Sequence, residues 1–300
     1  MRRLAGVLLL ALCATNPGYA ADDETRLRIV FFSDVHARTE WGTPEALALA
    51  AQAINAQDAD LVLGGGDLIT DGFQSGPAAV AARWDAYMAF HDALEGRVHT
   101  VIGNHDLVAA VPEDGSAPAA DPRAEFRERF GLERTYGSFD LHGYHVVLLD
   151  SIEITGPASK YQGRISREQL AWLADDLARI PPAQPVILAT HIPLVTSFFL
   201  FTEEPTAGAP TGRVIVNAAD VLQLFENRNL VLVLQGHMHV SESITWRGTT
   251  FVTGGAISGR WWRGDYEGTP AGFTLVELDG EDVDWRYVEL GWQPRRPAGQ

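Results

Sequence analysis

Short apolar runs alternate with helical patterns along the first third of the chain, and this alternation restricts the fold more than any other feature. The apolar runs lack the polar alternation of a half-exposed strand, which is typical of strands buried on both faces. The patterns between them are amphipathic. A βαβαβ order of this kind predicts a parallel sheet covered by helices. The strands are expected at 27–36, 60–66 and 97–106, and the helices at 43–57 and 78–94.

The same alternation resumes after a different middle segment. Residues 108–121 are rich in Pro, Ala and Asp and predict a loop, and residues 137–151 predict a hairpin that turns at His142-Gly143. Ser166 and Gln169 form a capping-box pattern at the start of the next helix. We find no internal repeat, so we predict one domain. Further strands are expected at 185–191, 230–239, 243–255, 272–280 and 282–290, with a helix at 217–228.

The first 20 residues have the three parts of a secretory signal peptide. Arg2 and Arg3 precede an apolar stretch, and small residues lead to a cleavage site after Ala20. The stretch is short for a membrane span, although an uncleaved anchor is the alternative. We therefore expect an exported protein, periplasmic or secreted, with no transmembrane span after cleavage. Its domain would cover residues 21–292, followed by a flexible tail at 293–300.

The net charge disfavours nucleic acid as a partner, and the cysteine content limits how the mature protein can be stabilised. The formal net charge is −16, and cleavage would make it −18 because two arginines are lost. A nucleic-acid-binding protein needs clustered Lys and Arg to displace counterions, and no such cluster is present. Cleavage would also remove Cys13, the single cysteine. The mature chain would then depend on its core or on bound metal for stability.

Ionisable residues stand at the ends of five apolar strands. Because the carboxyl ends of parallel strands meet at one edge of a sheet, these groups are expected to gather there. Five of the nine histidines are among them. The five strand ends are Asp34-Val35-His36, Gly66-Asp67, Gly103-Asn104-His105-Asp106, Thr190-His191 and Gly236-His237-Met238-His239.

Histidine and carboxylate together are the ligand set of Zn, Mn or Fe. In an extended segment, residues i and i+2 point the same way, so Asp34 and His36 could hold a single ion. The neighbouring glycines would let backbone approach the ions or an anion closely. Each fragment alone has an ordinary structural explanation as a turn or a hydrogen-bonded histidine. The ordered set of five predicts a metal centre.

This ordered set resembles the calcineurin-like metallophosphoesterase superfamily, whose motifs are D-x-H, G-D, G-N-H-D, H and G-H-x-H. The resemblance implies a four-layer αββα sandwich in which two mixed sheets are flanked by helices. It also implies two transition metal ions, divalent or trivalent, at one edge. One ion would bind Asp34, His36, Asp67 and His239, and the other Asp67, Asn104, His191 and His237. Spacing alone would place His237 and His239 on one ion, so their division comes from the family.

The expected chemistry is hydrolysis of a phosphate ester. Two divalent ions with two carboxylate ligands leave a positive site that suits a phosphate anion, and paired ions about 3.5–4 Å apart can generate hydroxide at neutral pH. By the same resemblance, His105 protonates the leaving oxygen, and Asp106 could orient its imidazole. The alternative for Asp106 is a turn residue that bonds to nearby backbone.

Differences from the motifs of known branches of this superfamily narrow the class of substrate. Protein phosphatases of this superfamily carry arginines in the G-D and G-N-H motifs, and purple acid phosphatases carry a metal-binding tyrosine where this chain has Thr70. The remainder resembles bacterial exported and cyclic-nucleotide phosphodiesterase-like enzymes. We expect a small phosphomonoester or phosphodiester as substrate. The alternatives are a binding protein on the same scaffold and a nuclease of the same superfamily, which the acidic charge disfavours.

Two segments could shape specificity. Arg260, Trp261, Trp262 and Arg263 could form an aromatic wall with a phosphate-binding arginine. The apolar residues 198–201 could form a lid over the substrate. Packing into the core is an equal alternative for both segments, because aromatic residues commonly pack there.

Overall fold

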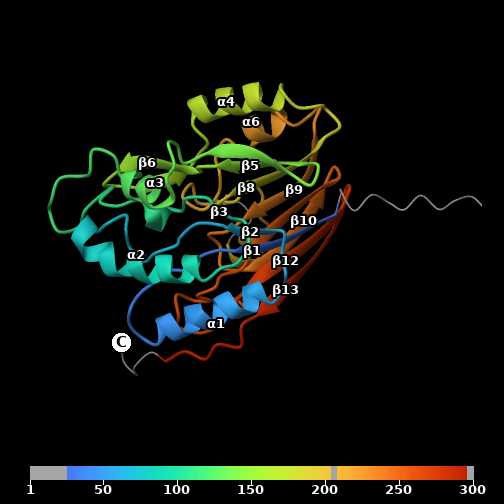
Figure 1. Cartoon of the computed structure of the whole chain (residues 1–300). Helices are drawn as coiled ribbons and strands as arrows, with labels where there is room; N and C mark the ends of the chain where they lie inside the picture. Colours follow the sequence, from blue (N-terminus) through green and yellow to red (C-terminus); the bar gives the residue numbers. More distant parts are fainter. Residues whose placement is uncertain (1–25, 204–207, 296–300) are drawn as a thin grey trace, which may run out of the picture.

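The computed structural model describes residues 26–203 and 208–295, so the predicted signal peptide and residues 296–300 of the predicted tail lie outside it. Two mixed sheets pack face to face, and helices cover both outer faces (Figure 1). This arrangement confirms the predicted four-layer sandwich. Within the described residues, no helix is both long and apolar enough to cross a membrane.

The first sheet has the strand order β13-β12-β1-β2-β3. The pairs β1–β2 and β2–β3 are parallel, as the βαβαβ pattern predicts, and the last two strands of the chain add an antiparallel edge. Its strands are β1 (Arg26–Phe32), β2 (Leu61–Gly64), β3 (Val98–Thr100), β12 (Gly272–Asp279) and β13 (Asp282–Glu289).

The second sheet has the order β10-β11-β9-β8-β5-β4, with β5, β8, β9 and β11 parallel. The predicted hairpin at His142-Gly143 is confirmed. Its strands are β4 (Gly137–Leu141), β5 (Tyr144–Leu149), β8 (Pro185–Thr190), β9 (Asn229–Gln235), β10 (Ser241–Trp246) and β11 (Thr249–Gly254). A separate hairpin of β6 (Ile152–Gly156) and β7 (Lys160–Gly163) was not predicted.

Side-chain alternation along β1 explains the layers. Leu27, Ile29 and Phe31 lie in the core between the sheets, whereas Val30 and Phe32 lie in the core shared with the helices. Both faces of β1 are therefore apolar from Ile29 to Phe32, and the sequence lacks polar alternation there, whereas Arg26 and Arg28 at the start of the strand are exposed. The helices are α1 (Thr43–Asn55), α2 (Pro77–Asp92), α3 (Ala124–Phe130), α4 (Arg167–Leu177), α5 (Phe198–Thr202) and α6 (Ala218–Gln223).

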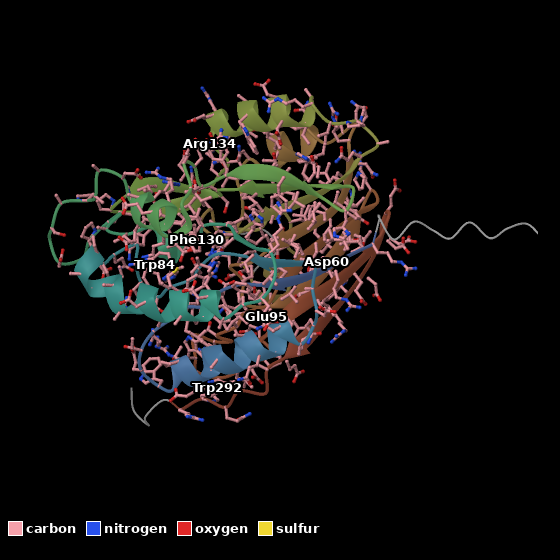
Figure 2. The ribbon with its side chains drawn as sticks, in the orientation of Figure 1. Asp60, Trp84, Glu95, Phe130, Arg134 and Trp292 are labelled. Atoms are coloured by element: carbon pink, nitrogen blue, oxygen red, sulfur yellow. The ribbon has the colours of Figure 1, made fainter. Side chains whose placement is uncertain are left out.

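Helices α1 and α2 cover the first sheet, and α4 and α6 lie over the second (Figure 1). Helix α3 packs on α2 through aromatic rings: Phe130 contacts Trp84 with ring centroids 6.5 Å apart (Figure 2). Ser166 caps α4 as predicted, since its hydroxyl accepts a hydrogen bond from Gln169 N at 3.2 Å. The Gln169 side chain does not complete the capping box, because it bonds instead to the backbone of Asp150.

Candidate metal centre

The predicted ligands follow the carboxyl ends of strands from both sheets. Asp34 and His36 follow β1, Asp67 follows β2, and Asn104 follows β3 in the first sheet. The remaining ligands come from the second sheet, and they follow β8 and β9. Hydrogen bonds join the two edges: His237 N donates to Asp34 Oδ2 at 2.9 Å. The face-to-face packing therefore brings residues more than 200 positions apart into one site.

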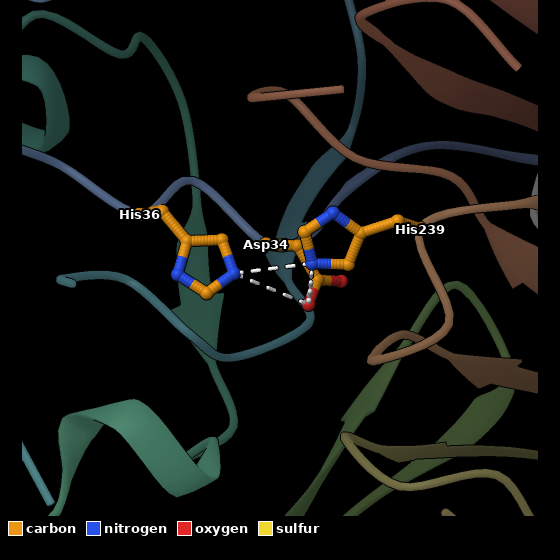
Figure 3. A group of neighbouring side chains, drawn as sticks. All are labelled: Asp34, His36 and His239. Atoms are coloured by element: carbon orange, nitrogen blue, oxygen red, sulfur yellow. Dashed lines mark hydrogen bonds and ion pairs between the residues drawn. The ribbon is translucent and has the colours of Figure 1, made fainter. Parts of the chain in front are cut away.

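Asp34, His36 and His239 form the first cluster, and all three side chains are buried. The Nε2 atoms of the two histidines lie 3.1 Å apart, and Asp34 Oδ1 lies 3.3 Å from His239 Nε2 and 3.9 Å from His36 Nε2 (Figure 3). The three ligand atoms thus converge on one small volume between the residues.

Asp67, His191 and His237 form the second cluster, which is also buried. His191 Nε2 lies 3.1 Å from His237 Nδ1, 3.2 Å from Asn104 Oδ1 and 3.3 Å from Asp67 Oδ2. Asn104 therefore joins this cluster as the sequence predicts. Every residue assigned to the two ions lies in one cluster or the other.

Asp67 lies between the two clusters. Its Oδ2 atom is 3.3 Å from His191 Nε2 on one side and 3.8 Å from His36 Nε2 on the other. Its Oδ1 atom accepts a hydrogen bond from His105 N at 2.8 Å, which fixes the carboxylate. A carboxylate in this position can reach two ions at once.

Unsatisfied buried atoms indicate that the residues fit metal ions. Asp34 Oδ1 is buried and accepts no hydrogen bond, and the facing imidazole nitrogens are closer than two lone pairs tolerate without a proton or a metal between them. The outer nitrogens of two ligands are held by carbonyls: His191 Nδ1 lies 2.8 Å from Gly65 O, and His239 Nδ1 lies 2.6 Å from Gly259 O. Such bonds leave Nε2 free as a ligand. The donor set of imidazole, carboxylate and amide oxygen suits Zn, Mn or Fe.

The backbone at the predicted ligands is strained rather than extended. Five of them have positive φ, a conformation uncommon for residues other than glycine. The sequence argument that Asp34 and His36 share an ion through strand alternation is therefore wrong in its reason, because both residues lie past the end of β1 and have positive φ. The side chains converge all the same. The φ values are 52° at Asp34, 45° at His36, 52° at Asp67, 69° at His237 and 56° at His239.

Glycines beside the ligands are required by close approach. A Cβ atom at Gly103 would lie 2.2 Å from Asp67 Oδ1. At Gly66, where φ is 89°, it would lie 2.8 Å from His191 Nδ1. Any side chain at either position would displace a ligand.

The pKa values of four of the predicted ligands are shifted by their surroundings. Burial acts to raise the pKa of Asp34, but the charges of His239 and His191 outweigh it and lower the pKa to about 2. Burial lowers the pKa of His36 far below its ordinary value and that of His237 to about 3. For His191, burial is outweighed by the carboxylate of Asp67, and the pKa is raised to about 9. The carboxylate is thus ionised and two of these imidazoles are neutral, whereas His191 must lose a proton to bind a metal.

His105 lies at the mouth of the site, and its ring contacts the ring of His36 edge to face at 4.7 Å. Its Nε2 atom lies 4.0 Å from Asp67 Oδ2. Its Nδ1 atom accepts a hydrogen bond from the backbone N of Asp71 at 3.0 Å, and the carboxylate of Asp71 lies 3.8 Å away. Asp71 therefore orients the imidazole and leaves Nε2 facing the metal centre.

Asp106 does not contact the His105 ring, so its predicted role in orienting His105 is wrong. Its carboxylate is buried and accepts hydrogen bonds from the backbone N of Leu68 (2.7 Å), Ile69 (3.2 Å) and Gly103 (2.8 Å). Burial and the charge of Asp67 raise its pKa to about 8. The side chain ties the loop after β3 to the loop after β2, which is close to the structural alternative.

Of the four residues 260–263, Trp262 is buried in the core, Trp261 lies against the metal centre, and the two arginines are exposed. Trp262 is buried, and its Nε1 donates to His36 O at 3.0 Å, which makes it part of the support for the site. Trp261 is half-buried and stacks on His239 with ring centroids 4.4 Å apart. The side chains of Arg260 and Arg263 are exposed and have no hydrogen bond or ion pair with a described residue.

Residues 198–201 belong to α5 rather than to the core. Leu200 and Phe201 are 67% and 85% exposed. The helix is anchored at its start, where Glu242 accepts hydrogen bonds from Thr196 Oγ1 and Ser197 N, both at 2.7 Å. Core packing is thus excluded for these two residues.

Sequence reasoning missed three residues near the metals. Asp71 stands four residues after the bridging Asp67, directly after Thr70, so a closer reading of the residues that follow the G-D motif could have found it. Tyr161, on β7, contacts the ring of His237 edge to face at 6.3 Å, and Arg213 lies close to both. No sequence signal marks Tyr161 or Arg213, because β7 was not predicted and Arg213 lies in a segment without a motif.

The comparisons with solved structures support the fold. The chain is similar to a dimetal phosphatase from Danio rerio (16% identity, TM-score 0.59, covering 88% of this chain and 99% of that one). It is also similar to GAP50, the anchor in the inner membrane complex of Plasmodium (17% identity, TM-score 0.56, covering 89% of this chain and 85% of that one). A third similar structure is the phosphopantetheinyl hydrolase from Mycobacterium tuberculosis (16% identity, TM-score 0.52, covering 92% of this chain and 100% of that one). No curated protein matches the sequence.

At these identities the structural likeness shows the fold alone, whereas the family model carries the assignment. The model described as calcineurin-like phosphoesterase matches residues 27–241. That range contains both histidine and carboxylate clusters and the Asp67 carboxylate between them. The chain therefore belongs to the calcineurin-like phosphoesterases, hydrolases that act on phosphate esters.

Proposed function

We propose that this protein is a dinuclear-metal-dependent hydrolase of small phosphate esters. The observation that carries the proposal is the position of Asp67 between two clusters of buried ligands. One ion would be held by Asp34, His36, Asp67 and His239, and the other by Asp67, Asn104, His191 and His237. A bound pair of such ions lowers the pKa of water and neutralises charge on a phosphoryl group.

His105 would serve the leaving group. Its Nε2 faces the metal centre, and the Asp71 amide that donates to Nδ1 keeps the ring in this orientation. In neutral His105 the ring proton therefore lies on Nε2, where it can be donated to an ester oxygen. For full transfer of the Nε2 proton His105 must act as the imidazolium, which takes its second proton at Nδ1 from solvent, gives up the hydrogen bond from the Asp71 amide, and returns to neutral imidazole after donation. The Asp71 carboxylate, 3.8 Å from Nδ1, would lie near the charge of this form.

The surroundings of the site would set substrate size. Trp261 covers His239, and α5 exposes two apolar side chains. We propose that Trp261 contacts the leaving group, with Arg260 and Arg263 beside it at the exposed rim. The N-terminal sequence supports export of the protein to the periplasm or the medium.

Metal analysis together with a substrate screen tests the proposal. We expect two metal ions per chain, turnover of phosphomonoesters, diesters or cyclic phosphates, loss of activity with a chelator, and recovery on adding metal. A protein that binds two ions but turns over no ester in the screen would contradict the proposal.

Two other functions are tested by the same preparation. GAP50 is an anchor with this fold, so a binding role is the first alternative, and metal-loaded protein without turnover would favour it. A nuclease is the second alternative, and cleavage of plasmid DNA would favour it. The acidic charge of −16 and the filled ligand positions favour the small-ester hydrolase over both.

A further inference from the structure

Arg213 differs from the other half-buried arginines of the described chain. Its guanidinium makes no hydrogen bond, ion pair or aromatic contact with a described residue. Its side-chain nitrogens remain accessible to solvent, so they are available to bind an anion. The other half-buried arginines are all paired: Arg38 with Glu40, Arg83 with Asp71, Arg123 with Asp150, Arg127 with Asp121, Arg129 with Glu125, Arg164 with Glu153, and Arg228 with Ile180 O.

The backbone on both sides of Arg213 is held next to the metal centre. Thr211 O accepts a hydrogen bond from Gly163 N at 2.8 Å, which joins this segment to β7. Ile215 N donates to Pro193 O at 2.9 Å, just beyond the ligand that follows β8. Arg213 therefore occupies a defined position and is not part of a free surface loop.

Tyr161 lies between Arg213 and the second cluster. Its ring contacts Phe73 at 5.5 Å on one side and His237 at 6.3 Å on the other. A Cβ atom at Gly212 would lie 3.7 Å from Tyr161 Cε2, so the backbone just before Arg213 packs on this ring. The Tyr161 hydroxyl makes no hydrogen bond with any residue that the structure describes.

The charge of Arg213 lies close enough to interact with both Tyr161 and His237. This proximity agrees with the backbone contacts of residues 211 and 215 and with the packing of Gly212 on the Tyr161 ring. An anion bound beside the second cluster would therefore also be attracted by Arg213.

We propose that Arg213, together with the Tyr161 hydroxyl, binds the phosphoryl group of the substrate from the His237 side of the metal centre. The inference rests on the proposed function. A guanidinium can donate two parallel N–H bonds to phosphoryl oxygens, and the phenol can donate a third. His105 lies against His36 in the other cluster, so the ester oxygen would face His105 while Arg213 holds the phosphoryl oxygens.

Inorganic phosphate is the probe, used with the full-length metal-loaded protein. We expect Arg213→Gln to weaken phosphate binding roughly 10- to 100-fold, as loss of a charged hydrogen bond does, with an equal rise in the competitive inhibition constant. Tyr161→Phe should weaken it by several fold. Metal content should stay at two ions in both variants. The matched control is Arg167→Gln, because Arg167 is an exposed arginine at the start of α4 without a side-chain partner among the described residues.

Calorimetry separates this inference from the proposed function. If wild-type protein binds phosphate but hydrolyses no ester, the proposed function fails, and the affinity of Arg213→Gln still decides the inference. Unchanged phosphate affinity in Arg213→Gln with two ions bound overturns the inference, as does wild-type protein that binds no phosphate. If Arg213→Gln does not fold, Arg213→Lys provides the test. Lysine keeps the positive charge but loses the paired N–H donors of arginine. The folded, metal-loaded Arg213→Lys variant should therefore bind phosphate more weakly than metal-loaded wild type and more strongly than metal-free wild type.

Discussion

Two groups of histidines and carboxylates lie at opposite ends of β8, and they differ in how their atoms are paired. At the start of β8, His145 lies between Asp140 and Asp176, with its Nδ1 and Nε2 at 2.8 and 2.9 Å from one carboxylate each. Each nitrogen faces an oxygen, so a proton satisfies each contact. At the other end of β8, imidazole nitrogens face each other at 3.1 Å in two histidine pairs, His191 with His237 and His36 with His239. The buried Oδ1 of Asp34 has no hydrogen-bond donor there.

This difference separates a structural histidine from a ligand. Donor and acceptor atoms alternate around His145, which joins the β4–β5 hairpin to α4. In the metal centre imidazole nitrogens face one another and Asp34 Oδ1 has no donor, so these contacts need a shared proton or a metal ion between them. Residue types alone do not distinguish the two groups.

Asp67→Asn should have the largest effect, because one carboxylate serves both clusters. We expect loss of both ions and a fall in activity well beyond the roughly 100-fold that loss of a supporting residue around a metal costs. Metal analysis and phosphatase assays measure both effects. Two retained ions with near-normal turnover would show that Asp67 does not bridge.

His105→Ala should lower hydrolysis of alkyl or ribose esters by about 10²–10⁴-fold, because a poor leaving oxygen needs a proton. The rate of hydrolysis of a nitrophenyl ester should fall much less, since its phenolate leaves without a proton. Metal content should not change. Equal losses on both substrates would assign His105 to phosphate positioning instead.

Metal affinity should depend on pH through His191, whose pKa is raised to about 9. Below that pH the ring is protonated, and a metal must displace the proton. Affinity should therefore rise with pH up to about 9, by about tenfold per unit for one proton. Calorimetry in buffers of different ionisation enthalpy should detect about one proton released at pH 7. Affinity independent of pH between 6 and 9 would contradict a protonated His191.

Asp106→Ala should reduce stability rather than change leaving-group preference, because three backbone N–H groups lose their acceptor. The expected loss is about 1–3 kcal/mol for an unsatisfied buried group, and more if all three stay unpaired. Denaturant unfolding measures it. A selective loss on alkyl esters at unchanged stability would restore the orienting role predicted from the sequence.

Asp176→Asn should have the smallest effect on stability and none on activity, and it tests the His145 group at the other end of β8. It weakens one hydrogen bond to His145 and should cost roughly 1–2 kcal/mol of unfolding free energy. Metal content and turnover should remain at wild-type values, because this group lies away from the metal centre. Loss of metal in this variant would mean that the two ends of β8 are coupled.

The sequence by itself determined that buried parallel strands are covered on both faces and that ionisable residues gather at one edge of the sheet, whereas the four layers and the division of ligands between two ions came from the family resemblance. Apolar residues on both faces of β1 require cover on both sides, and parallel strands bring their carboxyl ends to one edge. Asp34, Asp67 and His191 could therefore be predicted to gather from local patterns and strand order. Ser166 as a helix cap is equally local, because its partner lies three residues away.

Only the tertiary structure decided which atoms meet. Asp34 and His36 reach the metal centre through backbone of positive φ beyond the end of β1, which the apolar pattern of β1 does not encode. Asp71 rather than Asp106 orients His105, because the loop after β2 folds against the loop after β3. Arg213 and Tyr161 come together through the pairing of residue 211 with β7, a contact 48 positions apart along the chain. Such long-range contacts depend on packing between connections, and no local sequence period records them.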